Sequence, residues 1–237
     1  MSDDGANIVH PTAVVGAEVE LGRDNVIGPY AVLLGPTRLG DGNWIGPHVV
    51  LGTPAEIRGI DHGRAVAGGD GTVGRGLRIG DRNVLREYVT IHQGHHASTT
   101  VGDDCYLMNK VYIGHDGEIA DAVTMASSAT LGGHVHVGAG ANLGLGAIVH
   151  QRRIVGPGAM VGMGAVVTSD IPPFALGYGN PCRVRGANRV GLTRAGVDDD
   201  AIAALDRAYL DGSAVPPAPA AVPASAWQWW LARSPSP

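Results

Sequence analysis

An aliphatic residue recurs at every sixth position over most of the chain, and this period constrains the fold more than any other feature of the sequence. The series runs from Val9 to Leu51, from Ile79 to Ile91 and from Val101 to Val167, and it comprises eight, three and twelve hexapeptides, 23 in all. A glycine often follows the aliphatic residue. A period of six fits neither the 3.6 residues of a helical turn nor the two-residue alternation of an ordinary strand.

A hexapeptide period is typical of a parallel β-helix, in which three hexapeptides form one triangular coil of about 18 residues. Successive coils stack at roughly 4.8 Å, the spacing of neighbouring strands. The aliphatic residue is expected to fill the interior, and the glycine to provide the positive φ or the tight backbone that a corner requires. The sequence therefore predicts an all-β fold, a left-handed parallel β-helix of seven to eight coils, with an α-helical C-terminal region.

Two segments interrupt the period; the first is rich in Gly and Arg, and the second contains the adjacent pair His95 and His96. These segments, 53–78 and 93–100, are expected to leave the β-helix as surface loops. The predicted β-helix spans 1–185, and a short helical region with a Pro/Ala-rich linker is predicted for 186–237.

The C-terminal region contains two further signals. Asp198 precedes apolar residues at helical spacing, which predicts a capped helix that ends at about Gly212. Three of the four tryptophans lie between Trp227 and Trp230, and such a cluster needs a surface to pack on. We expect the rest of the C-terminal region to supply that surface.

Composition and charge exclude several classes of protein. The net charge of -5 gives no overall basic surface for nucleic acid. No apolar run approaches the ~18 residues that a membrane span needs, and no secretory leader is recognisable, so we expect a cytoplasmic protein without an integral membrane segment. Cys105 and Cys182 form no CxxC pair, which argues against both a disulfide framework and a zinc ribbon.

An 18-residue coil places residues 18 positions apart above one another, so His115, Gly133 and Gln151 are expected to stack. His134 and His150 lie one residue to either side of this column. Asp116 follows His115, and a carboxylate that holds one imidazole tautomer is what a general base near neutral pH requires. Convergence of these side chains on one strip of the β-helix indicates a catalytic site.

Zinc is a competing explanation for the histidines, because carbonic anhydrases of the same solenoid class bind zinc through a GHxxxxH pattern. In this chain Ala120 stands where the second histidine of that pattern would be. We therefore expect no metal at this site.

Several motifs occur in a specific order along the chain. They are IVHPTAVVG, IGDRNVLREYVTIHQG at 79–94, IGHDGEIA, ATLGGHVHVG, AIVHQRRIVG, DIPPFALGYGN and WWLARS. Together they resemble the UDP-N-acetylglucosamine O-acyltransferases of lipid A biosynthesis, a family of hexapeptide-repeat acyltransferases. The resemblance extends over nearly the whole chain. It implies acyl transfer from an acyl carrier protein thioester to a hydroxyl of a UDP-sugar, with no cofactor beyond the acyl-ACP or acyl-CoA donor.

The resemblance also implies roles for individual residues. His115 matches the general base, Asp116 its orienting partner, and the backbone N–H of Gly133 the oxyanion donor. Other positions match substrate contacts of the family, with Glu56 toward the sugar and Arg58 toward the phosphates. The full set of predicted substrate contacts is Glu56, Arg58, His92, Tyr112, His134, His150, Gln151, Asn188 and Arg194.

Two further expectations follow from the resemblance. Met163 matches the position that sets the depth of the acyl groove, and its volume predicts an acyl chain of about ten carbons or fewer. A convex prism cannot enclose a substrate by itself, so a neighbouring subunit is expected to supply the other wall of the site within a homotrimer.

Two alternatives remain open. The turn GNPCR is similar to that of CoA-dependent sugar acetyltransferases, and with Tyr112 it favours an acyl-CoA-dependent N-acyltransferase acting on a nucleotide amino sugar. In the second alternative the chain is a non-enzymatic solenoid that serves as a binding module, and the pair His115–Asp116 is a solvated surface pair.

Overall fold

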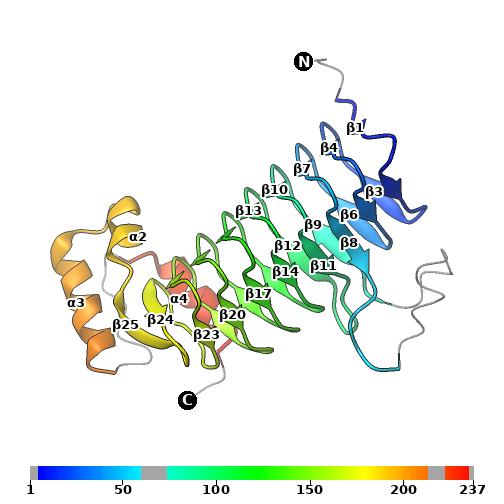
Figure 1. Cartoon of the computed structure of the whole chain (residues 1–237). Coiled ribbons are helices and arrows are strands. Elements are labelled where there is room, and N and C mark those ends of the chain that lie inside the picture. Colours follow the sequence, from blue (N-terminus) through cyan, green and yellow to red (C-terminus); the bar gives the residue numbers. More distant parts are fainter. Residues whose placement is uncertain (1–4, 60–73, 213–221, 235–237) are drawn as a thin grey trace.

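The computed structural model describes residues 5–59, 74–212 and 222–234. Three sheets form the faces of a triangular prism whose coils stack from the N-terminal to the C-terminal end (Figure 1). Each complete coil contributes one strand to each sheet, and the strands of successive coils pair in parallel. The predicted left-handed parallel β-helix with C-terminal helices is confirmed.

The strands are short and are distributed over the three sheets as follows. Sheet A contains β1 (Ile8–Val9), β4 (Val26–Ile27), β7 (Trp44–Ile45), β10 (Val84–Leu85), β13 (Tyr106–Leu107), β16 (Thr124–Met125), β19 (Asn142–Leu143), β22 (Met160–Val161), β24 (Ala175–Tyr178) and β25 (Arg183–Ala187). Sheet B contains β2 (Val14–Val15), β5 (Val32–Leu33), β8 (Val50–Thr53), β11 (Thr90–His92), β14 (Tyr112–Ile113), β17 (Thr130–Leu131), β20 (Ile148–Val149) and β23 (Val166–Val167). Sheet C contains β3 (Val19–Leu21), β6 (Thr37–Leu39), β9 (Leu77–Ile79), β12 (Thr99–Val101), β15 (Glu118–Ile119), β18 (His136–Val137) and β21 (Ile154–Val155).

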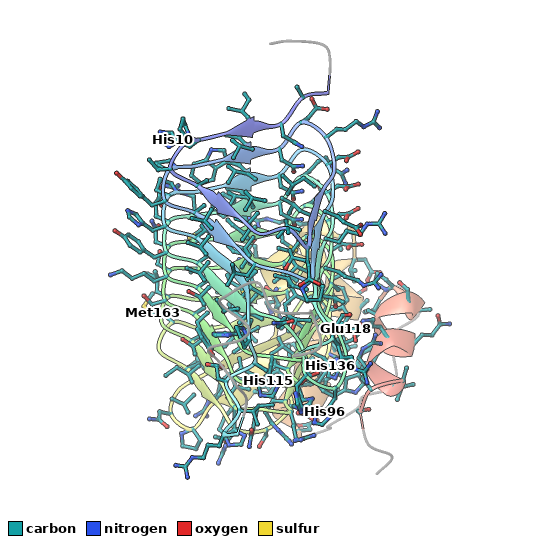
Figure 2. The ribbon with its side chains drawn as sticks, turned by 90° about the vertical axis from the view of Figure 1, so that its right-hand side faces the viewer. His10, His96, His115, Glu118, His136 and Met163 are labelled. Atoms are coloured by element: carbon teal, nitrogen blue, oxygen red, sulfur yellow. The ribbon has the colours of Figure 1, made fainter. Side chains whose placement is uncertain are left out.

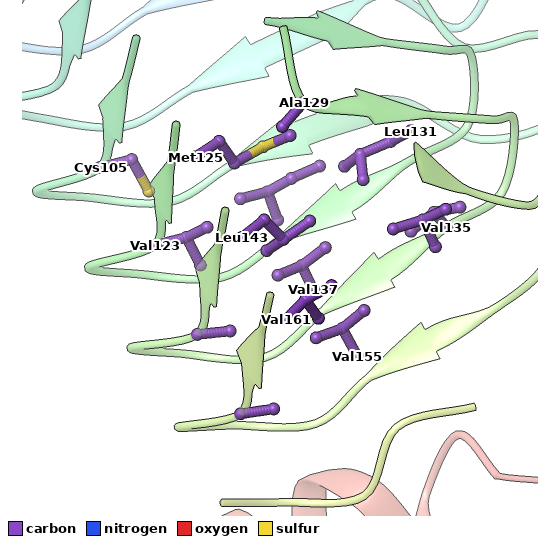
Figure 3. Packing of buried hydrophobic residues seen from close by; sticks show 14 of the residues in the cluster. Cys105, Val123, Met125, Ala129, Leu131, Val135, Val137, Leu143, Val155 and Val161 are labelled. Carbon is purple, nitrogen blue, oxygen red and sulfur yellow. The ribbon is translucent and has the colours of Figure 1, made fainter. Parts of the chain in front are cut away.

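The aliphatic residues of the hexapeptides form the core. In the described part of the chain, strands β1–β23 each contain one of the 23 predicted aliphatic residues. Met125, Leu143 and Val161 stack in one such column inside the prism (Figure 3). From the second coil onward these residues are at most 3% exposed, whereas Val9 and Val15 in the first coil are 42% and 37% exposed. The first coil is more exposed because none of the described residues forms a coil over its outer side.

This difference in burial predicts that a Val→Ala substitution lowers the free energy of unfolding more in a covered coil than in the first coil. Val137→Ala removes two methyl groups from a fully buried side chain, and we expect a loss of about 2 kcal/mol of unfolding free energy. Val9→Ala is the matched control, and its half-exposed side chain is expected to cost well under half of that amount. Chemical denaturation of both variants measures the difference. Equal losses would contradict the assignment of the core.

The glycines that follow the aliphatic residues are required by close packing between coils. A Cβ at Gly102 would lie 2.1 Å from Oδ1 of Asp121 and 2.8 Å from its backbone nitrogen in the next coil. Positive φ values occur instead at the third residue after the aliphatic one, and they include Asp116 (57°) and His134 (59°). Of the two roles expected for these glycines, the structure supports the tight backbone, except at Gly52, whose φ is 73°.

The strand bounds locate the two insertions. Strand β8 ends at Thr53 and β9 begins at Leu77, which brackets the predicted loop 53–78, although residues 60–73 of it lie outside the described residues. Strand β11 ends at His92 and β12 begins at Thr99, close to the predicted loop 93–100. The expected domain boundary after residue 185 falls inside β25, which reverses direction and pairs antiparallel with β24.

Three helices follow the β-helix in the described part of the chain: α2 (Arg189–Arg194), α3 (Asp199–Leu210) and α4 (Ala224–Leu231). The side chain of Asp198 caps α3 by accepting a hydrogen bond from the backbone N–H of Ala201 at 2.8 Å, as predicted. The predicted Pro/Ala-rich linker lies mostly in 213–221, outside the described residues.

A residue just after helix α4 ties this helix to the β-helix. Trp227 and Trp230 are buried, and the expectation that they pack on the rest of the C-terminal region stays a prediction. Arg233 follows α4 and donates hydrogen bonds to Glu118 on sheet C, and its guanidinium lies 4.3 Å from the Trp229 ring centroid. Glu118 also accepts a hydrogen bond from His136, at 3.1 Å. The bond from His136, together with Arg233, lowers the pKa of Glu118 to about 2 despite burial. Figure 2 shows α4 beside Glu118 and His136.

The outer faces of the three sheets differ in chemistry. Sheet A and sheet B carry mainly apolar or aromatic side chains on their outer faces: Val26, Trp44 and Val84 on sheet A, and Val14, Val32, Val50 and Ile148 on sheet B. Sheet C carries charged side chains there: Glu20, Arg38, Arg78 and Glu118. No helix within the described ranges is long and apolar enough to cross a bilayer.

Candidate active site

The candidate site lies where the chain turns from sheet B to sheet C. Strands β14, β17 and β20 pair in register, so the residues that follow them, His115, Gly133 and Gln151, occupy equivalent positions in three successive coils. A hydrogen bond of 2.9 Å from the backbone N–H of His134 to the carbonyl oxygen of His115 links two of these turns. The stacking predicted from the 18-residue spacing is present.

His115 and Asp116 form a hydrogen-bonded pair. Nδ1 of His115 lies 2.7 Å from Oδ2 of Asp116, and the Asp116 side chain is only 1% exposed. The left-handed backbone at Asp116 lets its short side chain turn back toward the preceding imidazole. Since a carboxylate only accepts hydrogen bonds, the proton of the neutral imidazole is placed on Nδ1 and the lone pair on Nε2.

The second oxygen of Asp116 is held by a loop that precedes it in the chain. Oδ1 accepts hydrogen bonds from the backbone N–H groups of His95 (3.0 Å), His96 (2.7 Å) and Ala97 (2.7 Å). Burial alone would raise the pKa of Asp116, but the bonds from Ala97, His115 and His96 outweigh burial and lower it. The carboxyl group is therefore ionised and fixed in orientation at neutral pH.

His134 completes the cluster. Its Nε2 lies 3.7 Å from Oδ2 of Asp116, and its ring is perpendicular to that of His115 at a centroid distance of 5.1 Å. Burial lowers the pKa of His134, with contributions from Arg152, although Asp116 acts in the opposite sense. The ring of His96 stacks on His134 at 5.9 Å. Figure 2 shows His115 and His96 on the same side of the prism.

Gly133 lies against the imidazole of His115. A Cβ at this position would lie 2.7 Å from Nε2 of His115 and 2.8 Å from its Cε1, so a larger residue cannot be added without moving the ring. Within the described residues, the N–H of Gly133 has no backbone acceptor. Nε2 of His115 and the backbone of Gly133 are therefore neighbours on the corresponding turns of two adjacent coils.

A groove of about 630 Å³ lies on sheet B next to the first insertion, and it contains three predicted substrate contacts. His92 lines it, with Nε2 at 3.7 Å from Oε1 of Glu56 and Nδ1 at 2.8 Å from the carbonyl oxygen of Pro54. Arg58 lines the groove from the insertion. The ring of Tyr112 lies 5.4 Å from that of His92, and its hydroxyl is buried without a partner among the described residues.

Other predicted contacts lie further from His115 in the single chain. His150 and Gln151 are exposed on the turn after β20, where Nδ1 of His150 lies 3.0 Å from the carbonyl oxygen of Gln151. Asn188 caps α2: its side chain accepts a hydrogen bond from Gly191 and donates one to Gly158. Arg194 is exposed in the last turn of α2, at the C-terminal end of the β-helix (Figure 1).

Met163 lies at a different corner from His115. It follows β22, where the chain turns from sheet A to sheet B, and it is 74% exposed. Figure 2 places it at a different edge of the prism from His115. Within one chain, Met163 and His115 are thus separated by the width of sheet B.

The larger groove, of about 670 Å³, lies elsewhere, on the charged face of sheet C. Glu20, Arg38, Arg78 and Asp81 line it, and none of the predicted site residues does. The cluster around His115, rather than groove size, therefore identifies the site.

Sequence reasoning misses the contribution of the loop from Gly94 to Thr99. The sequence predicts only a surface loop for this segment, yet three of its amides hold Asp116. A Cβ at Gly94 would lie 1.6 Å from the carbonyl oxygen of Ala97, which explains the glycine at the start of this tight turn. The position of the insertion, one coil before the His115–Asp116 pair, is the signal in the sequence that points to this contact.

Comparisons with known proteins agree with the motifs. The family model described as Udp N-acetylglucosamine O-acyltransferase; Domain 2 matches residues 170–211. The chain is 40% identical over 136 residues to the acyl-[acyl-carrier-protein]--UDP-N-acetylglucosamine O-acyltransferase of Pseudomonas savastanoi, a match that covers 56% of this chain and 53% of that protein. A protein of the same name from Burkholderia thailandensis is 38% identical over 136 residues, covering 56% of this chain and 52% of that protein. The chain spans about half the length of the curated relatives it matches.

Solved structures match over more of the chain. The UDP-N-acetylglucosamine acyltransferase from Campylobacter jejuni has a TM-score of 0.72 at 25% identity, covering 97% of this chain and 90% of that one. The UDP-N-acetylglucosamine O-acyltransferase from Moraxella catarrhalis has a TM-score of 0.71 at 27% identity, covering 88% and 86%. The resemblance predicted from the motifs is confirmed.

Proposed function

We propose that this chain, a relative of the UDP-N-acetylglucosamine O-acyltransferases, transfers an acyl group from an acyl carrier protein thioester to a hydroxyl of UDP-N-acetylglucosamine or a similar UDP-sugar. The observation that carries the proposal is the His115–Asp116 pair, with Oδ1 of Asp116 fixed by three amides and Nε2 of His115 packed against Gly133. A base and an oxyanion donor on adjacent turns are the two groups that direct acyl transfer requires.

The reaction proceeds in one displacement without a covalent enzyme intermediate. Nε2 of His115 takes the proton of the sugar hydroxyl as its oxygen attacks the thioester carbonyl carbon. The N–H of Gly133 stabilises the oxyanion that forms. When the intermediate collapses, the carbon–sulfur bond breaks and the thiolate receives the proton from His115. Asp116 stabilises the imidazolium between these steps and does not itself take the proton.

The surrounding residues supply the substrate contacts in this proposal. Glu56 and His92 in the sheet B groove face the sugar, and Arg58 offers a fork of donors to the phosphates. His134, beside the base, contacts the same sugar, and the exposed pair His150 and Gln151 lies two coils further on.

We further propose that the active form is a homotrimer. Sheets A and B both present apolar outer faces, and the corner between them carries apolar side chains that are more than half exposed: Tyr30, Tyr88, Leu145 and Met163. Closed three-fold assembly around this corner would cover both faces and leave the charged sheet C in water. It would also bring Arg194 and Met163 of a neighbouring copy to the site. Light scattering is expected to give the mass of three chains, whereas a fully active monomer would contradict the shared site.

The acyl chain is proposed to extend from His115 along the interface between subunits toward the corner of the neighbouring copy that carries Met163. The Met163 side chain ends the groove there, so decanoyl or shorter donors are expected to be preferred. Met163→Gly removes that volume and is expected to shift the preference toward tetradecanoyl donors by about tenfold or more. Competition between donors of different length measures the shift. A preference for tetradecanoyl donors in the unmodified protein would contradict this role.

We propose that catalysis needs no metal or other cofactor, because the His115–Asp116 pair and the Gly133 amide together supply proton transfer and oxyanion stabilisation. We also propose that the protein acts in the cytoplasm, in keeping with its proposed substrates, an acyl carrier protein thioester and a UDP-sugar.

A direct assay tests the proposed function. The protein is incubated with UDP-N-acetylglucosamine or other UDP-sugars, including amino sugars, and with acyl carrier protein or CoA thioesters in parallel. We expect ester formation from the carrier-protein donor. If only an amide forms, and only from acyl-CoA, the N-acyltransferase alternative replaces the proposal. A folded trimer that is inactive with every combination of acyl donor and UDP-sugar would favour a binding module.

A further inference from the structure

The base and its neighbours also have the composition and geometry of a metal site. One ligand atom from each of His115, Asp116 and His134 lies within 4.8 Å of the other two, and within the described ranges this is the one such group of three. Nδ1 of His115 is 2.7 Å and Nε2 of His134 is 3.7 Å from Oδ2 of Asp116. Ligands of a tetrahedral zinc ion are roughly 3.3 Å apart, given metal–ligand distances of about 2.0–2.1 Å. The two measured distances lie on either side of this value.

The arrangement is held in place before any ion binds. Three amides fix Oδ1 of Asp116, so Oδ2 remains directed at both imidazoles. His115 and His134 lie on adjacent coils joined by a backbone hydrogen bond of 2.9 Å. Outer hydrogen bonds that orient a carboxylate ligand strengthen metal binding. A fourth position is open to water or to the exposed side chain of His96, whose ring stacks on His134.

We propose that His115, Asp116 and His134 bind a divalent transition-metal ion such as Zn²⁺, and that the bound ion switches off the general base. The donor set of two imidazoles and one carboxylate suits zinc and its neighbours in the first row rather than magnesium or calcium. The ion is an inhibitor in this proposal, so it does not conflict with metal-independent catalysis.

Inhibition follows from the tautomer of His115. In the absence of metal, Asp116 holds the imidazole proton on Nδ1, and Nε2 has the lone pair that takes the substrate proton. When a metal ion occupies Nδ1, the single proton of the neutral imidazole must lie on Nε2. The ring then has no lone pair facing Gly133 and cannot act as a base. The inhibitory part of the proposal rests on the proposed function, whereas the binding part does not.

Co²⁺ is the probe for binding, because its visible absorption reports tetrahedral coordination. The chelator-treated full chain is titrated with Co²⁺, and we expect one ion per chain, displaced by Zn²⁺. His134→Ala is expected to weaken binding at least tenfold. The matched control is His136→Ala, which removes a histidine that lies 3.1 Å from a different carboxylate, that of Glu118, and is expected to leave binding unchanged. If Co²⁺ gives no tetrahedral absorption, or if the His134→Ala and His136→Ala variants bind Co²⁺ equally well, the proposed metal site is wrong.

Two further readouts separate this proposal from the proposed function. Nitrogen NMR of histidine-labelled protein is expected to show the His115 proton moving from Nδ1 to Nε2 when Zn²⁺ is added, whether or not a substrate is known. Acyl transfer should fall in step with Zn²⁺ occupancy and return with a chelator. Undiminished transfer at full occupancy would overturn the inhibitory role, whereas tight binding by a chain that is inactive on every substrate would overturn the proposed function alone.

Discussion

Replacement of His115 by alanine is expected to lower kcat/KM for acyl transfer by about a thousandfold, because general-base catalysis contributes on the order of 10²–10⁴ in rate. The loss should fall on kcat, since the imidazole acts on the proton that moves in the transition state. Asp116→Asn should lower kcat as well, because an amide does not hold the proton on Nδ1 of His115 as an ionised carboxylate does. Steady-state assays with the carrier-protein donor measure both effects.

The control for this prediction is His10→Ala. His10 lies in the first coil, far from the site, and its side chain contacts only Thr12 in the described structure (Figure 2). This variant should retain the activity of the unmodified protein. If His115→Ala were equally active, the assignment of the general base would be wrong, provided that the variant remains folded by circular dichroism.

The second large loss of acyl-transfer activity is expected for Gly133→Ala. The added methyl carbon would lie 2.7 Å from Nε2 and 3.2 Å from Cδ2 of His115, so the ring must move away from the hydroxyl that it deprotonates. The methyl group would also occupy space beside the amide that faces the oxyanion. Together these displacements should lower kcat by about a hundredfold or more, because removal of oxyanion stabilisation alone costs about 10²–10³.

Gly16→Ala is the matched control for Gly133→Ala. Gly16 also follows a strand of sheet B, and a Cβ there would meet its nearest atom, the carbonyl oxygen of Leu33, at 3.4 Å, an ordinary contact. We expect near-normal activity and stability for this variant. Near-normal activity of Gly133→Ala would show that the imidazole is not where catalysis requires it.

The β-helix could be predicted from the sequence because each coil contacts only its neighbours, so one six-residue pattern determines both local strands and long-range packing. For the same reason, the 18-residue spacing of His115, Gly133 and Gln151 is sufficient to predict that they share one column. The resemblance to the family adds roles for residues in the sheet B groove, such as His92 and Glu56.

Contacts made by irregular segments could not be predicted in this way. The amides of His95, His96 and Ala97 hold Asp116 through backbone groups, which leave no mark on residue type. The contact of Arg233 with Glu118 joins positions 115 residues apart that no period relates. Asn188 matches a ligand contact of the family, whereas its side chain is engaged in capping α2, because Asn is also a preferred N-cap residue.

A crystal structure of the trimer with UDP-N-acetylglucosamine tests the central claim most directly. The account predicts that the sugar lies at the turn between sheets B and C, with one hydroxyl within about 3 Å of Nε2 of His115 and the diphosphate near Arg58. A nucleotide sugar bound with every hydroxyl out of reach of His115 would contradict it.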